Sequence, residues 1–562
     1  MDIFNVLSLL GGLAMFLYGM NVMGDGLAKT AGGKLEKILE KLTSTPIKGV
    51  LLGAAVTGVI QSSSATTVMV VGLVNSGIMK LRQAVGIIMG ANIGTTVTSW
   101  ILSLTGIQSD NIFINMLKPS SFSPILAVIG IIFLMFTRSE KKHDIGGILL
   151  GFTVLMFGME MMSGAVAPLK DVPEFTNILT MFSNPFLGML VGMLITAIIQ
   201  SSSASVGILQ ALCATGAVSF GTAIPIIMGQ NIGTCVTALI SCIGTKKNAK
   251  RAAFVHLYFN IIGTVVFMVV FYTVNSFVHF QFLNDSANAA GIAVVHSVFN
   301  VAATLLLLPF SGGLEKLATL TVRDKDEVEK NTPAELEMLK RLDARFLEKP
   351  AFAVGHCIEV VKYMAQLSKN SVDMALSLVD NYDEAVRDKV EDLEGIIDTY
   401  EDEVGSYMVK LSSKELSHED SQKVSIGLHV IGDLERMSDH AITIADICRK
   451  MNEAGASFSE KAKSELGVYK DAVQNIVSMT VEAYDKEDLQ EASHVEPLEE
   501  AINELNSAVK KQHIKRLQKG KCTIELGISL ENLINNYERV ADHCSNVAVA
   551  MLQLKSDNFD TH

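Results

Sequence analysis

Two short polar stretches interrupt long apolar segments of this sequence. Gln-Ser-Ser-Ser occurs at 61–64 and again at 200–203, and no charged residue lies between Lys48 and Lys80 around the first copy. An amide and three hydroxyls can donate hydrogen bonds to an anion or offer oxygen atoms to a cation. Polar groups inside apolar sequence are costly without partners, so both stretches are candidates for a binding site within a membrane.

A second polar motif accompanies each copy. Asn-Ile-Gly-Thr occurs at 92–95 and at 231–234, again 139 residues apart, and the same offset relates Gly19-Met20 to Gly158-Met159. A register kept without a gap over this distance indicates the internal duplication of a membrane unit. The predicted binding residues are Gln61, Ser62, Ser63, Ser64, Asn92, Thr95, Gln200, Ser201, Ser202, Ser203, Asn231 and Thr234.

Glycines flank both Asn-Ile-Gly-Thr motifs. Because glycine tolerates unusual backbone conformations, we expect them to let the helix open locally at the binding site. The glycines concerned are Gly90, Gly94, Gly229 and Gly233.

Long apolar segments must position these motifs. A bilayer core of about 30 Å needs roughly 20 apolar residues of helix. The segments that meet this need, at least approximately, are 3–23, 82–105, 120–137, 145–166, 221–243, 252–275 and 291–310. The segments 47–76 and 186–217, which carry the Gln-Ser-Ser-Ser stretches, are ambiguous. If each crosses the membrane, the repeats are parallel; if each is a re-entrant hairpin, the repeats are inverted.

The distribution of basic residues favours the hairpins. Cytoplasmic loops are enriched in Lys and Arg. With hairpins, one side of the membrane carries Lys29, Lys34, Lys37, Lys41, Lys48, Lys80, Arg82, Arg138, Lys141, Lys142, Lys246, Lys247, Lys250 and Arg251. The opposite side receives only Lys118 and Lys170. We therefore predict an all-α, multi-pass protein of the inner (plasma) membrane with inverted repeats, seven crossings, an external amino terminus and a cytoplasmic carboxyl-terminal domain.

The absence of charged residues near the motifs restricts which ions the site can bind. No Asp or Glu occurs from Lys41 to Gln108 or from Phe175 to Thr245. A site of neutral ligands holds a lone ion poorly at the membrane midplane, whereas an anion and several monovalent cations compensate each other. The pattern thus predicts cation-coupled anion transport and disfavours proton coupling. The alternative is that Ser, Thr and Gly only pack helices together, which two copies in register make less attractive.

Three ionisable residues in the apolar half receive a structural interpretation. Glu160 is interpreted as paired or near an interface, and His256 and His296 as residues near segment ends or within packed helices.

The twin Gln-Ser-Ser-Ser motifs with "GANIGT" and "GQNIGT" resemble the sodium–phosphate cotransporter family, the type II Na/Pi symporters and their bacterial relatives. The resemblance covers about residues 1–310. It implies that residues 61–64 and 200–203 bind phosphate and sodium where the repeats meet, and that sodium ions are co-transported.

The carboxyl-terminal part differs in composition from the apolar part that precedes it. Lys, Arg, Asp and Glu become dense, about six amphipathic helices follow, and most of the net charge of −13 resides here. "LERMSDHAITIAD" at 434–446 resembles "YERVADHCSNVAV" at 537–549, an offset of 103. Carboxylates at positions i and i+4 share one helix face and could form half of a metal site. The predicted metal ligands are Glu394, Asp398, Glu435, Asp439, Glu538 and Asp542; the match of Glu499 and Asn503 to Glu394 and Asp398 is weaker.

These duplicated three-helix halves resemble PhoU-like regulators of phosphate uptake, which implies divalent or ferric ions at the carboxylates and a homodimer or regulatory partner. The expected domains are a membrane domain over 1–312 (repeats about 1–140 and 145–310), a linker over 313–335 and a helical regulatory domain over 336–556.

Sodium-coupled phosphate symport is the favoured function. The alternatives are a membrane phosphate sensor and a phosphate exporter of the same family. The sequence contains no nucleophile–base pair, Walker loop or dinucleotide fingerprint, so an enzyme is not expected. It has no basic surface for nucleic acid, and its seven scattered cysteines predict no disulfide framework.

Overall fold

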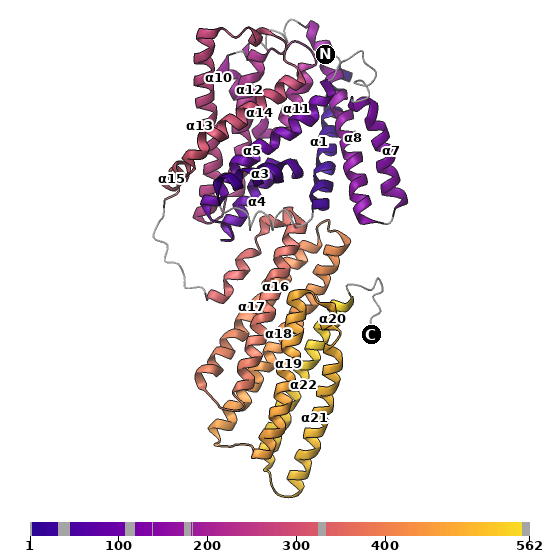
Figure 1. Ribbon diagram of the computed structural model, residues 1–562, viewed down its shortest axis with the longest axis vertical. Helices are drawn as coiled ribbons and strands as arrows, with labels where there is room; N and C mark the ends of the chain where they lie inside the picture. Colours follow the sequence, from indigo (N-terminus) through magenta and orange to yellow (C-terminus); the bar gives the residue numbers. More distant parts are fainter. Residues whose placement is uncertain are drawn as a thin grey trace. The chain divides into compact units, whose positions relative to one another are not determined.

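The computed structural model is built from helices (Figure 1). It describes residues 3–31, 45–106, 118–137, 139–172, 181–182, 184–323 and 333–553, and in these the only β-type pairing is an isolated bridge between Ser219 and Ser286. The chain divides into two compact units, Met1–Val328 and Glu329–His562. Part of the predicted linker over 313–335 is helical, because α15 (Ser311–Thr321) extends into it and η5 begins at Ala334.

The first unit supplies the predicted membrane crossings. In the described residues, six helical stretches are long and apolar enough to span a bilayer: Ile3–Thr30, Leu81–Gly106, Lys141–Leu169, Phe220–Ser241, Lys247–Val278 and Ala289–Thr321. The seventh predicted crossing, at 120–137, corresponds to α7 (Pro119–Phe136) of 18 residues. The crossings expected from apolar length are therefore all present as helices.

Each Gln-Ser-Ser-Ser stretch separates two short helices. These are α3 (Pro46–Ile60) and α4 (Ser63–Asn75) in the first repeat, and α10 (Pro185–Ile199) and α11 (Ser202–Cys213) in the second. Helices of 12 to 15 residues extend only about 18–23 Å, which is too short to cross a bilayer core.

The packing of α3 against α5 (Leu81–Ser103) shows that the segment returns to its starting side. Gly86 lies against the carbonyl of Pro46, and Gly94 lies against the carbonyl of Ala54, so α3 and α5 run parallel. Because α4 connects the end of one helix to the start of the other, it must run back along the unit. The prediction of a re-entrant hairpin is confirmed, and α10 packs against α12 (Phe220–Ser241) in the same way.

Two equivalent helices reveal the inverted relation of the repeats. The offset of 139 makes α8 (Glu140–Val166) the counterpart of α1 (Ile3–Ala31). The offset pairs Gly12 with Gly151 and Gly19 with Gly158. In the structure the contacts are exchanged: Gly12 lies against the carbonyl of Gly158, and Gly19 lies against that of Gly151. Antiparallel helices with interchanged contacts are related by a twofold axis. The inverted-repeat prediction is therefore confirmed.

The expectation that glycines open the helix at the asparagines is wrong. The helices α5 and α12 continue without interruption through both Asn-Ile-Gly-Thr motifs. A Cβ atom on Gly90 would lie 2.0 Å from the carbonyl oxygen of Val50, and one on Gly229 would lie 1.9 Å from that of Met189. These glycines instead allow the backbones of α3 and α5, and of α10 and α12, to approach closely.

The second unit is a helical bundle with two similar halves (Figure 1). The first half contains α16 (Pro350–Ser377), α17 (Glu384–Ser412) and α18 (His418–Glu453). The second contains α19 (Glu460–Lys486), the short α20 (Leu489–Ala492), α21 (Val495–Gln518) and α22 (Ile524–Gln553). The halves join through α18 and α22, which carry the related Glu-x-x-x-Asp motifs. The six long helices agree with the number expected from the amphipathic pattern.

Candidate ion-binding site

The backbone makes the same sharp turn at both Gln-Ser-Ser-Ser stretches. Gln61 ends α3 in the left-handed conformation at φ 59°, and Gln200 ends α10 at φ 58°. In each, the following serine caps the next helix: Ser62 Oγ accepts from the amide of Ala65, and Ser201 Oγ accepts from that of Ala204, both at 3.2 Å. A left-handed glutamine is strained by roughly 1–2 kcal/mol. Strain of this kind concentrates at functional positions.

The two turns, which we call the first tip (61–64) and the second tip (200–203), lie against each other. Ser63 Oγ and Ser202 Oγ are 3.4 Å apart, although 139 residues separate them. Ser64 Oγ donates to the carbonyl oxygen of Gln200 at the same distance. Since Ser63 and Ser202 are counterparts under the repeat offset, their contact marks the twofold axis of the unit.

This contact also brings two helix amino termini together. Ser63 is the first residue of α4, and Ser202 is the first residue of α11. Both serines are buried, with exposed fractions of 4% and 5%. The first turn of a helix has amide groups without intrahelical acceptors and carries partial positive charge. Two such ends at one buried point favour the binding of an anion.

The asparagines of the two Asn-Ile-Gly-Thr motifs lie beside asparagines that the sequence analysis missed. Asn92 donates through Nδ2 to Oδ1 of Asn260 on α13 (Lys247–Val278), and Asn231 donates to Asn300 on α14 (Ala289–Leu307), both at 2.6 Å. The partners occupy equivalent places in "VHLYFN" at 255–260 and "VHSVFN" at 295–300. That repeat at an offset of 40 could have identified them.

Thr95 and Thr234 are buried and bonded within their own helices. Thr95 Oγ1 donates to the carbonyl of Ala91 at 3.1 Å, and Thr234 Oγ1 donates to that of Gln230 at 3.0 Å. Each hydroxyl thus uses its proton locally and keeps its oxygen lone pairs. These oxygens remain able to coordinate a cation.

The histidines that precede the new asparagines are both buried, with 1% of each residue exposed. His296 Nδ1 lies 2.7 Å from Ser99 Oγ, whereas the ring of His256 has no hydrogen-bond partner among the described residues. The counterpart of Ser99 is Ala238, which has no hydroxyl to offer. Both positions agree with the packed-helix interpretation.

The two glutamines differ strongly in their surroundings. Gln61 is buried: its Oε1 accepts from Thr98 Oγ1 at 2.9 Å, and its Nε2 donates to the carbonyl of Gly58. Gln200 is exposed, and the hydroxyl of Thr237, the counterpart of Thr98, is buried without a partner among the described residues. The first tip is therefore closed over its glutamine, while the second tip is open.

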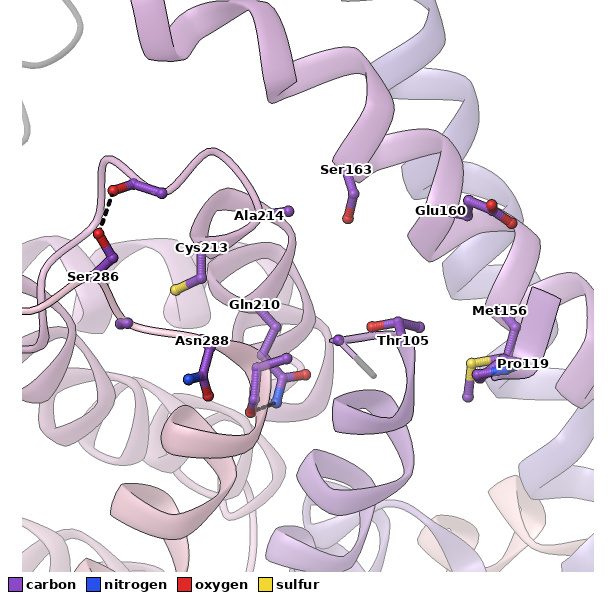
Figure 2. Close-up of a pocket in the computed structure, with 14 residues that line it drawn as sticks. Thr105, Pro119, Met156, Glu160, Ser163, Gln210, Cys213, Ala214, Ser286 and Asn288 are labelled. Carbon is purple, nitrogen blue, oxygen red and sulfur yellow. Dashed lines mark hydrogen bonds between the residues drawn. The ribbon is translucent and has the colours of Figure 1, made fainter. Parts of the chain in front are cut away.

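A cavity of about 360 Å³ lies further along α11 from the second tip (Figure 2). Gln210 forms part of its wall, eight residues beyond Ser202 and hence about 12 Å away along the helix. Its Nε2 donates to the carbonyls of Ser99 at 3.1 Å and Ala289 at 2.9 Å, which ties α11 to α5 and α14. Glu160, exposed on α8, also lines this cavity, so it does not lie at the tips.

In the second unit, the predicted metal ligands gather on neighbouring helices. Burial raises the pKa of Glu394 on α17, and the nearby Asp439 and Asp398 raise it further. Burial and Asp439 likewise raise the pKa of Glu435 on α18. Within the described residues, however, no three His, Cys, Asp or Glu side chains are arranged to hold a metal ion.

The second group of carboxylates has amide partners. Burial raises the pKa of Glu499 on α21, Asn503 opposes that effect, and Asp542 adds to it. Asn506 donates through Nδ2 to Glu538. This arrangement is less negative than the first group because Asn503 stands where Asp398 stands in the first half.

Comparisons with known proteins agree with the duplicated architecture of both units. The sequence pattern of the Na+/Pi-cotransporter family matches residues 15–164 and 171–293, which contain both tips. The chain belongs to the Na+/Pi-cotransporter family. It also carries a PhoU domain, whose pattern matches residues 361–448 and 468–551. This member is thus a multi-pass membrane protein of a phosphate transporter family, joined to a helical PhoU unit.

Relatives of this family member cover different parts of its chain. YqeW of Bacillus subtilis, a protein without an assigned function, is 30% identical over 56% of this chain and 97% of its own. YjbB of Salmonella typhimurium, provisionally described as an inorganic phosphate export protein, is 23% identical over 98% of this chain and 97% of its own. The rat sodium-dependent phosphate transport protein 2A is 38% identical over 17% of this chain and 15% of its own.

Solved structures of PhoU proteins resemble part of this chain. PhoU from Pseudomonas aeruginosa has a TM-score of 0.35 and 18% identity, and the match covers 37% of this chain and 98% of that protein.

Proposed function

We propose that this protein moves inorganic phosphate across a membrane together with sodium ions, and that both tips and the Asn-Ile-Gly-Thr motifs bind the ions. The contact between Ser63 and Ser202 carries the proposal, because it joins two helix amino termini at a buried twofold axis. These helix ends favour a phosphate anion. Neutral hydroxyl and amide oxygens around them suit sodium, whose charge would offset that of phosphate.

Transport requires that the site open alternately to the two sides, and two inverted repeats provide a means. In such proteins, one repeat can rock against the other around a fixed midplane site. The closed first tip and the open second tip support this function, because the same turn occurs here with two sets of hydrogen-bond partners. The cavity at Gln210 would be the route to the side opposite the basic loops, which we propose is external.

A phosphate exporter is the second candidate. YjbB, whose alignment covers 98% of this chain and 97% of YjbB itself, is described as a phosphate exporter. The relative described as sodium-dependent covers only 17% of this chain, although that part is more similar. A sensor that binds phosphate without moving it is a third outcome of the same experiment.

The test is phosphate flux in proteoliposomes that contain the purified full-length protein. Symport predicts phosphate uptake that requires an inward sodium gradient and fails when potassium replaces sodium. Flux that follows the phosphate gradient without sodium would contradict symport and favour the exporter. Phosphate binding without flux would favour the sensor. Protein with both Ser63→Ala and Ser202→Ala is the matched control, because it should insert normally but bind poorly.

We also propose that the PhoU unit is cytoplasmic and holds divalent or ferric ions at its carboxylates. Carboxylates are the ligands that hard cations prefer. The raised pKa values of Glu394 and Glu435 fit this role, because a cation would relieve the repulsion between grouped carboxylates. The side chains would need to move together to surround an ion.

A further inference from the structure

A second cavity, in the PhoU unit, has a different chemical character from the acidic surface around it. It measures about 220 Å³ and lies in the second half of the unit, where the segment before α19 meets the turn between α21 and α22. Among the described residues that line it, the ionisable ones other than cysteine are His513, Arg516 and Lys521, and none is a carboxylate. A cavity lined by basic groups in a chain of net charge −13 calls for an explanation.

Arg516 uses only part of its hydrogen-bonding capacity. Its Nη1 donates to Glu465 Oε2 at 2.6 Å, and both side chains are largely buried, with exposed fractions of 12% and 20%. The other terminal nitrogen, Nη2, is buried and has no acceptor among the described residues. A buried guanidinium donor without an acceptor is costly, and a planar guanidinium is well suited to an oxyanion with two acceptor atoms.

His513 adds a second donor to the same wall. It is 92% buried, and its side chain forms no hydrogen bond within the described part of the unit. Burial lowers its pKa and Arg516 lowers it further, while Glu531 and Glu465 act in the opposite direction. The neutral ring retains one N–H group that can donate to a ligand.

Three further features make the cavity favourable for negative charge. Lys521 lies at its exposed edge and forms no ion pair among the described residues. Ser459 caps the 27-residue helix α19, so the partially positive amino terminus of that helix faces the same region. Ser457 and Ser459 supply hydroxyl groups to the wall.

We propose that this cavity binds a phosphate-type oxyanion, either inorganic phosphate or the phosphoryl group of a small molecule. The oxyanion accepts from Arg516, His513 and Lys521, and it supplies the acceptor that Arg516 Nη2 lacks. The cavity volume of about 220 Å³ has room for one phosphate or a diphosphate. Because this site lies wholly within the PhoU unit, it is separate from the tips and would let that unit respond to phosphate or to a phosphorylated metabolite.

Cys522 provides a local reporter of this site. It lines the cavity, and it is the only one of the seven cysteines that is not buried. The experiment measures how fast an uncharged maleimide modifies Cys522 in the detergent-purified full-length protein, in sodium-free buffer. We expect inorganic phosphate or pyrophosphate to slow the reaction several-fold and saturably. Chloride at equal ionic strength should have no such effect.

Two variants test the assigned donors. Lys521→Gln should weaken the protective effect about tenfold or more, as expected when a charged donor is lost. Arg516→Gln should be combined with Glu465→Gln, because Arg516→Gln alone would leave a largely buried carboxylate without its partner. The double variant should abolish protection. Lys515→Gln, at an exposed neighbouring position outside the cavity, is the matched control and should retain it.

The outcomes separate this site from the transport site. Protection should persist in the Ser63→Ala, Ser202→Ala protein even if that protein no longer transports phosphate. Protection by phosphate identifies the free ion as a ligand, and protection by pyrophosphate alone identifies a molecule that carries a diphosphate. No saturable protection, equal protection by chloride, or unchanged protection in both cavity variants would overturn the proposal.

Discussion

The two tips of the membrane unit share a sequence and a backbone turn, yet they differ in their polar contacts. At the first tip, Thr98 bonds Gln61, and Thr57 Oγ1 donates to Thr66 Oγ1 at 3.0 Å. At the second tip, neither bond has a counterpart. The equivalent residues are Thr196, Ser205 and Thr237, and their buried hydroxyls have no hydrogen-bond partner among the described residues. The duplication therefore preserved the turn, while the tertiary environment gave each copy its own set of hydrogen bonds.

The PhoU unit shows the same behaviour with charged groups. Its halves share the Glu-x-x-x-Asp motifs of α18 and α22. Asp398 lies in the first carboxylate group, whereas Asn503 takes its place in the second and lowers the pKa of Glu499 through a hydrogen bond. In both units, symmetry of the backbone does not imply symmetry of the polar contacts.

Substitutions of Ser63 and Ser202 should weaken ion binding equally, and this is the largest effect we expect. If both bind the same phosphate and its sodium ions, Ser63→Ala and Ser202→Ala should each weaken binding by about 1.5–3 kcal/mol, or roughly tenfold to hundredfold. Both ions should lose apparent affinity, because coupled ligands affect each other reciprocally. Phosphate and sodium titrations of transport provide the measurement. Normal affinities in both variants would exclude these serines as ligands.

Gly90 and Gly229 test the symmetry of the helix packing. In Gly90→Ala the new methyl group would meet the carbonyl of Val50, and in Gly229→Ala it would meet that of Met189, so one helix must move in each. We expect each change to destabilise the membrane unit by about 1–3 kcal/mol. Thermal unfolding in detergent measures this loss. Gly147→Ala is the control, since no atom of the described residues outside its own helix backbone lies within 4 Å of a Cβ atom there. If the variants unfold like the control, close packing is not what requires these glycines.

Substitutions of the equivalent residues Thr98 and Thr237 should have different effects on stability, because only Thr98 bonds a tip glutamine. Thr98→Val removes the hydrogen bond to Gln61 and should cost about 1 kcal/mol. Thr237→Val removes a buried hydroxyl that has no partner among the described residues, so it should be neutral or slightly stabilising. The apparent melting temperatures of the two proteins, compared in parallel, measure the difference. Equal losses would mean that the second tip also closes over its glutamine in solution.

The smallest effect concerns pH in the PhoU unit. The pKa values of Glu394 and Glu435 are raised, so the folded unit binds protons more tightly than the unfolded chain. Its stability should therefore fall as the pH rises from about 4.5 through these raised values. Hydrogen exchange of peptides from α17 and α18, followed with pH, measures this loss. Asp398→Asn should reduce this loss. The pKa of Glu499 on α21 is already raised by burial, so Asn503→Asp, which removes the opposing amide and adds a carboxylate, should enlarge the corresponding loss in α21 and α22. If the exchange rate, after correction for its intrinsic dependence on pH, stays constant over this pH range, the raised pKa values are contradicted.

Much of the architecture could be predicted because it depends on local or strictly periodic features. Apolar length predicted the crossings, the offset of 139 predicted the duplication, and the basic loops predicted the hairpins around 47–76 and 186–217. The crossings and the hairpins follow from the solvent preference of each segment, and the duplication follows from the recurrence of the motifs along the chain. The Gln-Ser-Ser-Ser stretches could likewise be recognised as a candidate site from the sequence, because polar groups within an apolar segment require hydrogen-bond partners in any fold.

The identity of those partners was decided by the tertiary structure. Asn92 and Asn231 bond Asn260 and Asn300, which lie 168 and 69 residues away. A glycine beside an asparagine is equally compatible with an opened helix and with close packing, and only the approach of α3 to α5 selects the second. The different fates of Gln61 and Gln200 arise from the same cause. Sequence determines which groups need partners, whereas the packing of distant helices determines which groups come within hydrogen-bonding distance.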